Sequence, residues 1–243
     1  FGSNCLANSQ SGSNNTAVGT ATLLNNTSGN NNTSVGVSAL QNNVTGNFNT
    51  AIGYLAGTSA SSYDNTISIG NNGYLNGASN QAFIGNLSTA WNGGNQTWST
   101  FSDERMKTNI SDDVKGLDFI TRLRPVTYYR SIDAALKITG NKDSSGFPGK
   151  YDIEKIKYTG FLAQQVETAA KEAGYDFSGI TVPKSSNQLY TLSYEQFVVP
   201  LVKAVQELNQ LDKDLQVNIR DLKEQNKILS QRILVLESKQ KVE

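Results

Sequence analysis

The sequence predicts a mixed fold in three parts: an all-β repeat segment, a small α+β globular domain and a long C-terminal helix. Three observations predict it. Glycines recur every 17 residues in the first part, charged residues become frequent abruptly after Ser102, and leucines recur every seven residues near the end. We therefore place β repeats of a fibre stalk at 1–85, a connector at 86–101, the globular domain at 102–195 and a coiled-coil helix at 196–243.

The repeat has a strict phase. Its glycines lie 17 residues apart and the last follows after 15: Gly2, Gly19, Gly36, Gly53, Gly70 and Gly85. Small apolar pairs such as Ala17-Val18 precede these glycines, and Asn-rich turns lie between, since Asn and Gly tolerate positive φ. One repeat has too few apolar residues to bury its own apolar face. Stacked neighbouring repeats or other chains must therefore complete the core. Because that core is thin, we expect a trimeric β-helix or β-roll stalk.

Composition excludes several classes of function. The formal net charge is zero, which gives no electrostatic reason to expect nucleic acid or an anionic membrane as partner. No apolar run approaches the roughly 20 residues that span a bilayer. The chain has one cysteine, Cys5, and no histidine, so Ser-His-Asp catalysis and multi-cysteine metal sites are excluded. We expect no metal and no cofactor.

The middle segment alternates short helical and strand patterns. Apolar spacing predicts a helix over 114–123, which Pro125 ends, and a helix over 163–173, which ends at Gly174. Strands are predicted over 126–130, 158–161 and 189–192, and residues 138–150 are predicted to form a loop. Ser193 is expected to cap the long helix that follows.

The C-terminal segment carries a heptad repeat of leucine: Leu201, Leu208, Leu215, Leu222, Leu229 and Leu236. With leucine at d, the a positions hold Val205, Asp212, Ile219, Asn226 and Ile233, a pattern typical of a parallel coiled coil. Asn226 would fix the register at some cost in stability, and Asp212 weakens the early part. The heptad alone leaves dimer and trimer open, and we prefer a trimer because the repeat segment requires one.

The motif Ser102-Asp103-Glu104-Arg105-Met106-Lys107 lies at the change in composition, because residues 1–101 hold no Lys or Arg and a single acid, Asp64. A hydroxyl, a lysine five residues on and this break together indicate a self-processing junction. Without histidine, lysine must be the base, which requires burial or a nearby cation such as Arg105 to lower its pKa. Trimer assembly could supply the burial and so couple cleavage to folding. The alternative is a capping serine and a solvated lysine at a helix start.

Four stretches, taken in order, resemble a known family. They are Ser102 to Lys107, Leu123-Arg124-Pro125-Val126, Gly160-Phe161-Leu162-Ala163-Gln164-Gln165, and Leu201 to Leu208. They are similar to the endosialidase-type intramolecular chaperone, an auto-processing domain at the C-terminus of phage tailspikes and tail fibres. The resemblance covers residues 102 to about 240. The repeats resemble the stalks and heads of trimeric bacterial adhesins and of phage tail fibres.

The resemblance implies a homotrimer that aligns three repeat segments and then cuts itself off as a single-turnover serine peptidase. It implies that Ser102 and Lys107 are the catalytic pair and that the Ser102–Asp103 bond is cut. Ser102 cannot attack its own carbonyl, which would need a four-membered ring. Attack on the Phe101 carbonyl, a serine of another chain and an activated water all stay open.

One departure concerns a histidine that many members carry shortly before the Gly-Phe motif. Here that neighbourhood reads Lys155-Ile156-Lys157-Tyr158. If the histidine assists proton transfer, we expect cleavage in this chain to be slow or absent. Arg105 and Tyr158 are candidates for a supporting role.

We therefore expect an intramolecular chaperone that folds a fibre and then releases itself. The alternatives are a permanent trimeric anchor that never cleaves, and a receptor-binding tip whose repeat loops or residues 138–150 contact a host surface glycan. Because Gly2 is already in phase, we expect the rest of a fibre to precede this chain. The expected location is a phage virion tail fibre or, alternatively, a bacterial cell surface.

Overall fold

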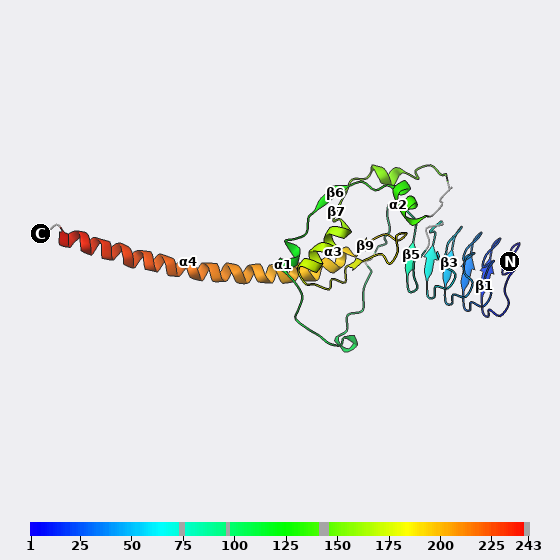
Figure 1. Cartoon of the computed structure of the whole chain (residues 1–243), viewed down its shortest axis with the longest axis horizontal. Coiled ribbons are helices and arrows are strands. Elements are labelled where there is room, and N and C mark those ends of the chain that lie inside the picture. Colours follow the sequence, from blue (N-terminus) through cyan, green and yellow to red (C-terminus); the bar gives the residue numbers. More distant parts are fainter. Residues whose placement is uncertain (73–75, 96–97, 141–145, 241–243) are drawn as a thin grey trace. The chain divides into compact units, whose positions relative to one another are not determined.

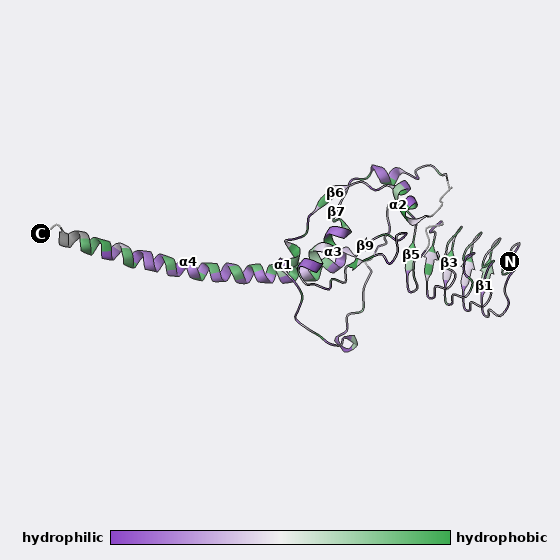
Figure 2. Cartoon of the chain, viewed as in Figure 1, coloured by the Kyte–Doolittle hydropathy of each residue, from purple (hydrophilic) through white to green (hydrophobic). Residues whose placement is uncertain are grey.

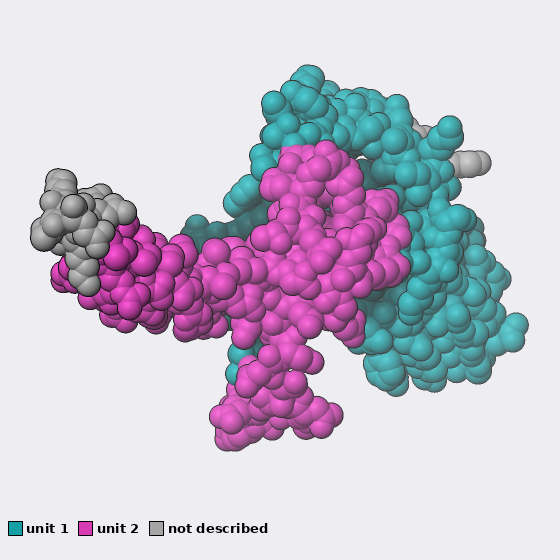
Figure 3. Space-filling view, turned by 60° about the vertical axis from the view of Figure 1, so that its left-hand side comes forward, with its two compact units in different colours: residues 1–102, 127–160, 182–189 teal, residues 103–126, 161–181, 190–243 magenta. Residues whose placement is uncertain are grey.

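The computed structural model describes residues 1–72, 76–95, 98–140 and 146–240. The chain forms two compact units, shown in Figure 3. Unit 1 comprises residues 1–102, 127–160 and 182–189, and unit 2 comprises residues 103–126, 161–181 and 190–243. The predicted mixed fold is confirmed: a β-solenoid precedes a small α/β region and a long helix.

The repeats of unit 1 form a solenoid of short parallel strands (Figure 1). Its sheet has the strand order β1-β2-β3-β4-β5. Each residue pairs with its counterpart one repeat later, as Val18 does with Val35, and the last pair, Ile69 and Ile84, keeps the shorter step. The strands are β1 (Thr16–Val18), β2 (Thr33–Val35), β3 (Thr50–Ile52), β4 (Ile67–Ile69) and β5 (Ala82–Ile84).

The interior of the solenoid is completed within one chain, by polar side chains as well as apolar ones. The apolar part is a cluster of Ala17, Leu23, Ala39, Leu40, Ala51 and Ala56. Beside it, asparagines form ladders: the Asn43 amide donates to Asn26 Oδ1 at 2.9 Å, and both side chains are fully buried. The Asn-rich stretches of the sequence indicate turns, and nothing in their pattern predicts that asparagine side chains fill the interior. The core therefore does not need other chains to close it.

Two backbone features recur with the repeat. Leu23 and Leu40 are buried at φ of 51° and 49°, a left-handed conformation that is uncommon outside Gly, Asn and Asp. Gly36 has φ of 131°, and a Cβ there would lie 2.4 Å from the carbonyl oxygen of Gly53. The glycine spacing is therefore required by close contact between the backbones of successive turns.

The remainder of unit 1 is a second small assembly. β6 (Val126–Tyr128) pairs with β7 (Tyr158–Gly160), close to the predicted strands. α2 (Ile132–Thr139), which begins after the capping hydroxyl of Ser131, was not predicted, and its last residues occupy the start of the predicted loop. The middle of that loop, 141–145, lies outside the described residues. η2 (Asp152–Lys155) follows, and its Glu154 carboxylate accepts a hydrogen bond from the Ile132 backbone at 2.6 Å.

Unit 2 has an aromatic core. Phe119 is fully buried in α1 (Leu117–Ile120) and lies 4.9 Å, between ring centroids, from Phe177. α3 (Ala163–Glu172) packs Val166 into the same cluster and ends at Gly174, whose φ is 59°, as predicted. The strands β8 (Ile180–Thr181) and β9 (Thr191–Leu192) pair antiparallel beside it. α1 is shorter than the predicted helix, because its chain first becomes helical after Gly116.

The long helix α4 (Val198–Gln240) follows η3 (Tyr194–Phe197) directly. Ser193 precedes η3 and not α4, and its side chain makes no capping hydrogen bond, so the predicted cap is wrong. The heptad leucines are exposed, from 51% at Leu201 to 63% at Leu236. Figure 2 shows apolar residues along the length of α4. Among the described helices, none is long and apolar enough to cross a membrane.

Candidate self-cleavage site

The Ser-Asp-Glu-Arg-Met-Lys motif lies where the two compact units meet in sequence. The first segment of unit 1 ends at Ser102 and the first segment of unit 2 begins at Asp103, which is the first of several points where the chain passes between the units. Every residue from Phe101 to Asp113 is exposed, and Figure 1 shows this segment as a loop whose only regular element is η1 (Glu104–Met106). The bond expected to be cut is therefore in an accessible, extended part of the chain.

Asp103, and not Ser102, caps η1. Its carboxylate accepts a hydrogen bond from the Arg105 backbone N–H at 2.9 Å, and the same carboxylate pairs with the Arg105 guanidinium, Nη2 to Oδ2, at 2.5 Å. The side-chain hydrogen bond from Arg105, with a smaller contribution from its backbone N–H, lowers the pKa of Asp103. The alternative prediction that Ser102 caps this helix is therefore wrong, because Asp103 is the capping residue.

The same ion pair changes the expected role of Arg105. The side-chain hydrogen bond to Asp103 raises the pKa of Arg105, so the guanidinium stays charged but beside a carboxylate. A cation compensated in this way exerts a weaker field on a neighbouring lysine than an isolated one. Burial of the lysine is then the more important of the two proposed ways to make it a base.

Lys107 ends η1, where its backbone N–H donates to the Glu104 carbonyl at 2.9 Å. The residue is exposed, as is Ser102. Desolvation is what disfavours the charged form of a lysine. A single chain in this conformation therefore does not provide the environment that the predicted chemistry requires.

Large apolar side chains in and beside the motif are also exposed to solvent. Phe101 is 91% exposed, Met106 68% and Ile110 69%. Three large apolar side chains within ten residues of an extended segment are a surface that water solvates poorly. The segment is thus suited to burial against another surface.

Tyr158, the second supporting candidate, lies in β7. Its ring stacks on Tyr128 of β6 at 5.8 Å between centroids, and the Arg130 guanidinium lies 4.3 Å from its ring centroid. Its hydroxyl is buried and has no hydrogen-bond partner among the described residues. Since an unsatisfied buried hydroxyl is unfavourable, the Tyr158 hydroxyl is available to a group that the single chain does not supply.

The other three motifs of the sequence come together within unit 2. The Arg124 guanidinium of the second motif donates to Gln165 Oε1 of the third motif at 3.0 Å. Phe161, also in the third motif, stacks on Phe197 at 5.3 Å, and its backbone N–H donates to the Tyr194 hydroxyl at 3.0 Å. Ala204 of the fourth motif is buried. Three stretches far apart in sequence therefore build one scaffold.

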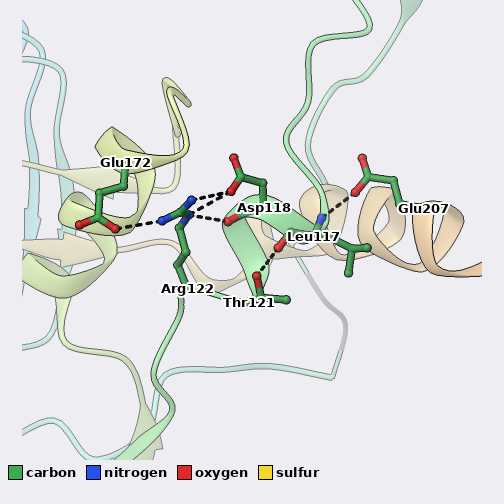
Figure 4. A network of polar contacts seen from close by, with 6 residues as sticks. All are labelled: Leu117, Asp118, Thr121, Arg122, Glu172 and Glu207. Atoms are coloured by element: carbon green, nitrogen blue, oxygen red, sulfur yellow. Dashed lines mark hydrogen bonds and ion pairs between the residues drawn. The ribbon is translucent and has the colours of Figure 1, made fainter. Parts of the chain in front are cut away.

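A polar network ties the helices of this scaffold together (Figure 4). Arg122, which follows just after α1, bonds Asp118 Oδ1 at 2.7 Å and reaches Glu172 at the end of α3 at 3.2 Å. The Leu117 backbone N–H, at the start of α1, donates to the Glu207 carboxylate of α4 at 2.7 Å. Sequence reasoning missed this network, because its members are 4 to 90 residues apart.

Gly116 shows how closely α1 approaches α4. A Cβ at this position would lie 2.5 Å from Glu207 Oε2 and 2.8 Å from the Ala204 backbone nitrogen. Only glycine fits this contact without a shift of the neighbouring atoms. The globular part of unit 2 is therefore joined tightly to the start of the long helix.

The comparison with protein families covers part of this scaffold. Residues 102–175 match the family model described as chaperone of endosialidase, whose model name, Peptidase_S74, denotes a peptidase. Residues 102–175 are an endosialidase-type chaperone domain. This family is found in phage tail fibres, which fits a virion location. No curated protein and no solved structure matches the chain.

The matched segment spans parts of both compact units, because it includes residues 127–160 of unit 1. The endosialidase-type chaperone domain begins at Ser102, the last residue of the first segment of unit 1, and reaches Tyr175, just after α3 ends. The repeats and α4 lie outside the matched residues. Ser102 and Lys107 lie inside them.

Proposed function

We propose that this chain is an intramolecular chaperone that trimerises through α4, aligns three solenoids and then releases them by self-cleavage at or next to the Ser102–Asp103 bond. The main support is one coincidence. The first boundary between the compact units along the chain, the start of the family match and the exposed Ser-Lys motif all fall at this bond.

Association of the chains rests on the unpartnered face of α4, and the number of three chains rests on the resemblance to the endosialidase-type chaperone. The six heptad leucines are exposed along a single helix that extends from Val198 to Gln240, well beyond the globular part. Exposed leucine at every d position has no role in an isolated helix, whereas it forms the buried seam of a coiled coil. Three joined helices hold three solenoids at high effective concentration.

Assembly also supplies what the cleavage chemistry lacks. Lys107 is exposed in one chain, and the apolar side chains of Phe101, Met106 and Ile110 beside it are exposed as well. When these side chains pack against a partner subunit, the segment loses water and the neutral form of the lysine becomes accessible. Cleavage therefore follows correct assembly and does not precede it.

The covalent step then proceeds through a serine ester. A serine Oγ attacks the scissile carbonyl carbon while its proton passes to the lysine Nζ, and the C–N bond breaks as that proton passes to the leaving amine. Water hydrolyses the ester. For cleavage after Ser102 the attacking hydroxyl comes from another chain, and for cleavage before it Ser102 attacks the Phe101 carbonyl.

The test compares intact masses of the parent with Ser102→Ala and Lys107→Ala after purification. We expect the parent to split near residue 102 and both variants to remain whole. The matched controls, Ser111→Ala and Lys115→Ala, change the same residue types a few positions further on and should split like the parent. The fragment masses differ by one serine residue between the two candidate bonds.

A permanent trimeric anchor is the second candidate, and a specific observation favours it. The guanidinium of Arg105 is compensated by Asp103, and lysine and tyrosine occupy the stretch where many family members carry histidine. A parent chain that stays at full length while its native mass is that of a trimer would establish the anchor and reject self-cleavage.

A further inference from the structure

The outer face of the solenoid sheet carries a column of large aliphatic side chains. The third residue of every strand points outward, and the parallel register stacks these residues directly on one another. Their exposed fractions run from 36% to 50%: Val18, Val35, Ile52, Ile69 and Ile84. The middle residues of the first four strands, which point inward, are small and buried: Ala17, Ser34, Ala51 and Ser68.

This order is the reverse of what a sheet facing water requires. In a sheet with one solvated face, polar residues point outward and large apolar ones inward. Here the interior is filled by buried leucines from the turns and by asparagine ladders, as with Leu23 and Asn43. The β-branched residues on the outside are therefore half-exposed and lie outside the apolar cluster of the interior.

The face is also without charge. Residues 1–101 hold no Lys or Arg, and their single acid, Asp64, accepts hydrogen bonds from Asn47 in a turn ladder outside the strands. The first outward positions of the strands are Thr16, Thr33, Thr50, Ile67 and Ala82. A flat, uncharged face of Thr, Val and Ile can meet an identical face without leaving a charge unpaired.

We propose that this Val/Ile column is the surface through which the solenoids of separate copies of this chain contact one another. The proposal rests on the proposed function, because α4 brings further copies of the same column into reach. The ladder hydrogen bonds run within one chain, as from Gly36 to Val18. The copies therefore pack side by side as complete solenoids and do not exchange strands.

The area of the face within residues 16–84 can be compared with that of stable interfaces. Strands about 4.8 Å apart with residues about 3.3 Å long give these five three-residue strands a face of roughly 250 Å². A stable protein interface buries roughly 800 Å² per partner. These five strands alone therefore contribute only part of a stable interface, and tethering through α4 supports the contact between them.

The test is chemical cross-linking of the full-length chain with a short bismaleimide, in a background that carries Cys5→Ser and also Ser102→Ala, so that the chain stays uncleaved and its solenoid stays tethered to α4. Ile52→Cys places a thiol in the column. Asn42→Cys, an exposed turn position outside the strands, is the matched control, and Leu215→Cys reports on α4. A two-ended linker joins two chains, so the expected product on a denaturing gel is a dimer with residual monomer.

We expect dimer from Ile52→Cys and Leu215→Cys and little from Asn42→Cys, with Ile69→Cys repeating the result if Ile52→Cys folds poorly. Cross-linking at Leu215 without cross-linking at either column position overturns the proposed face and leaves the trimer intact. Equal cross-linking at Ile52 and Asn42 indicates random collision and also overturns it. Absence of cross-linking at all positions rejects the assembly itself.

Discussion

Replacing Asn43 by alanine tests whether asparagine ladders hold the solenoid together. The Asn43 side chain is fully buried, and its amide donates to Asn26 Oδ1 and to the Gly46 carbonyl, each at 2.9 Å. Alanine removes both of these hydrogen bonds, as well as a longer one that Asn49 Nδ2 donates to Asn43 Oδ1 at 3.4 Å, and leaves Asn26 Oδ1, which is also buried, without this donor. Asn42, its neighbour in sequence, is exposed and provides a control of the same residue type.

The magnitude follows from the contacts. Two lost hydrogen bonds cost about 1 kcal/mol each, and leaving the buried oxygen without its donor adds about 1 kcal/mol or more. We therefore expect Asn43→Ala to lower the free energy of opening the solenoid by about 3 kcal/mol. Since about 1.4 kcal/mol corresponds to a factor of ten, this is a roughly 100-fold increase in the open population.

Hydrogen exchange followed by mass spectrometry measures this quantity locally, in peptides that cover β2 and β3, so the second unit does not obscure it. In Asn43→Ala these peptides should exchange roughly 100-fold faster than in the parent, whereas Asn42→Ala should leave their rates unchanged. If the two variants exchange alike, the ladders do not stabilise the solenoid, and its stability must come from the apolar cluster alone.

Two further predictions concern the backbone and pH. Gly36→Ala should destabilise the solenoid by more than about 2 kcal/mol, because φ is 131° and a Cβ would meet the next turn's carbonyl. At Gly94 a Cβ meets nothing within 4 Å, so Gly94→Ala should have the melting temperature of the parent. If Gly36→Ala and Gly94→Ala melt at the same temperature, the backbone strain argued for Gly36→Ala is contradicted. Hydrogen bonds from Lys171 and then Tyr190 lower the pKa of Glu167. The ionised Glu167 carboxylate therefore stabilises unit 2 fully at pH values above the pKa that Glu167 has in the unfolded chain. This stabilisation is lost as the pH falls through the lower pKa that Glu167 has in the folded chain. A carboxyl-carbon NMR titration should give Glu167 a midpoint below its ordinary 4.5, and a midpoint at or above that value would refute the contact.

The 17-residue period of the sequence agrees with the observed strand register. Identical residues in successive repeats stack on one another, so Val18 lies beside Val35. The period could not show whether the ladder runs within one chain or between chains, because the spacing is the same in both. Side-chain amides such as that of Asn43 decide this, since they close the interior within a single chain.

Local signals also predicted several elements of the globular part and missed others. The end of α3 at Gly174 follows from a left-handed glycine, which a sequence reveals directly. α2 was missed although Ser131 and Gly140 are its caps, because the polar residues beyond it favoured a loop. Serine is a common N-cap residue, but the short η3 lies between Ser193 and the start of α4.

Some features of the candidate site could also be predicted from the sequence, whereas others depend on the tertiary structure. The change in charge at residue 102, the Ser-Lys motif and the heptad leucines are properties of the order of residues, so the sequence alone determined them. The pairing of Arg105 with Asp103 and the contact of Arg124 with Gln165 depend on backbone geometry and on approach between distant segments. No periodicity in a sequence encodes such contacts, so only the tertiary structure decided them. The exposure of Lys107 belongs with these, because burial is a property of the surroundings and not of the residue itself.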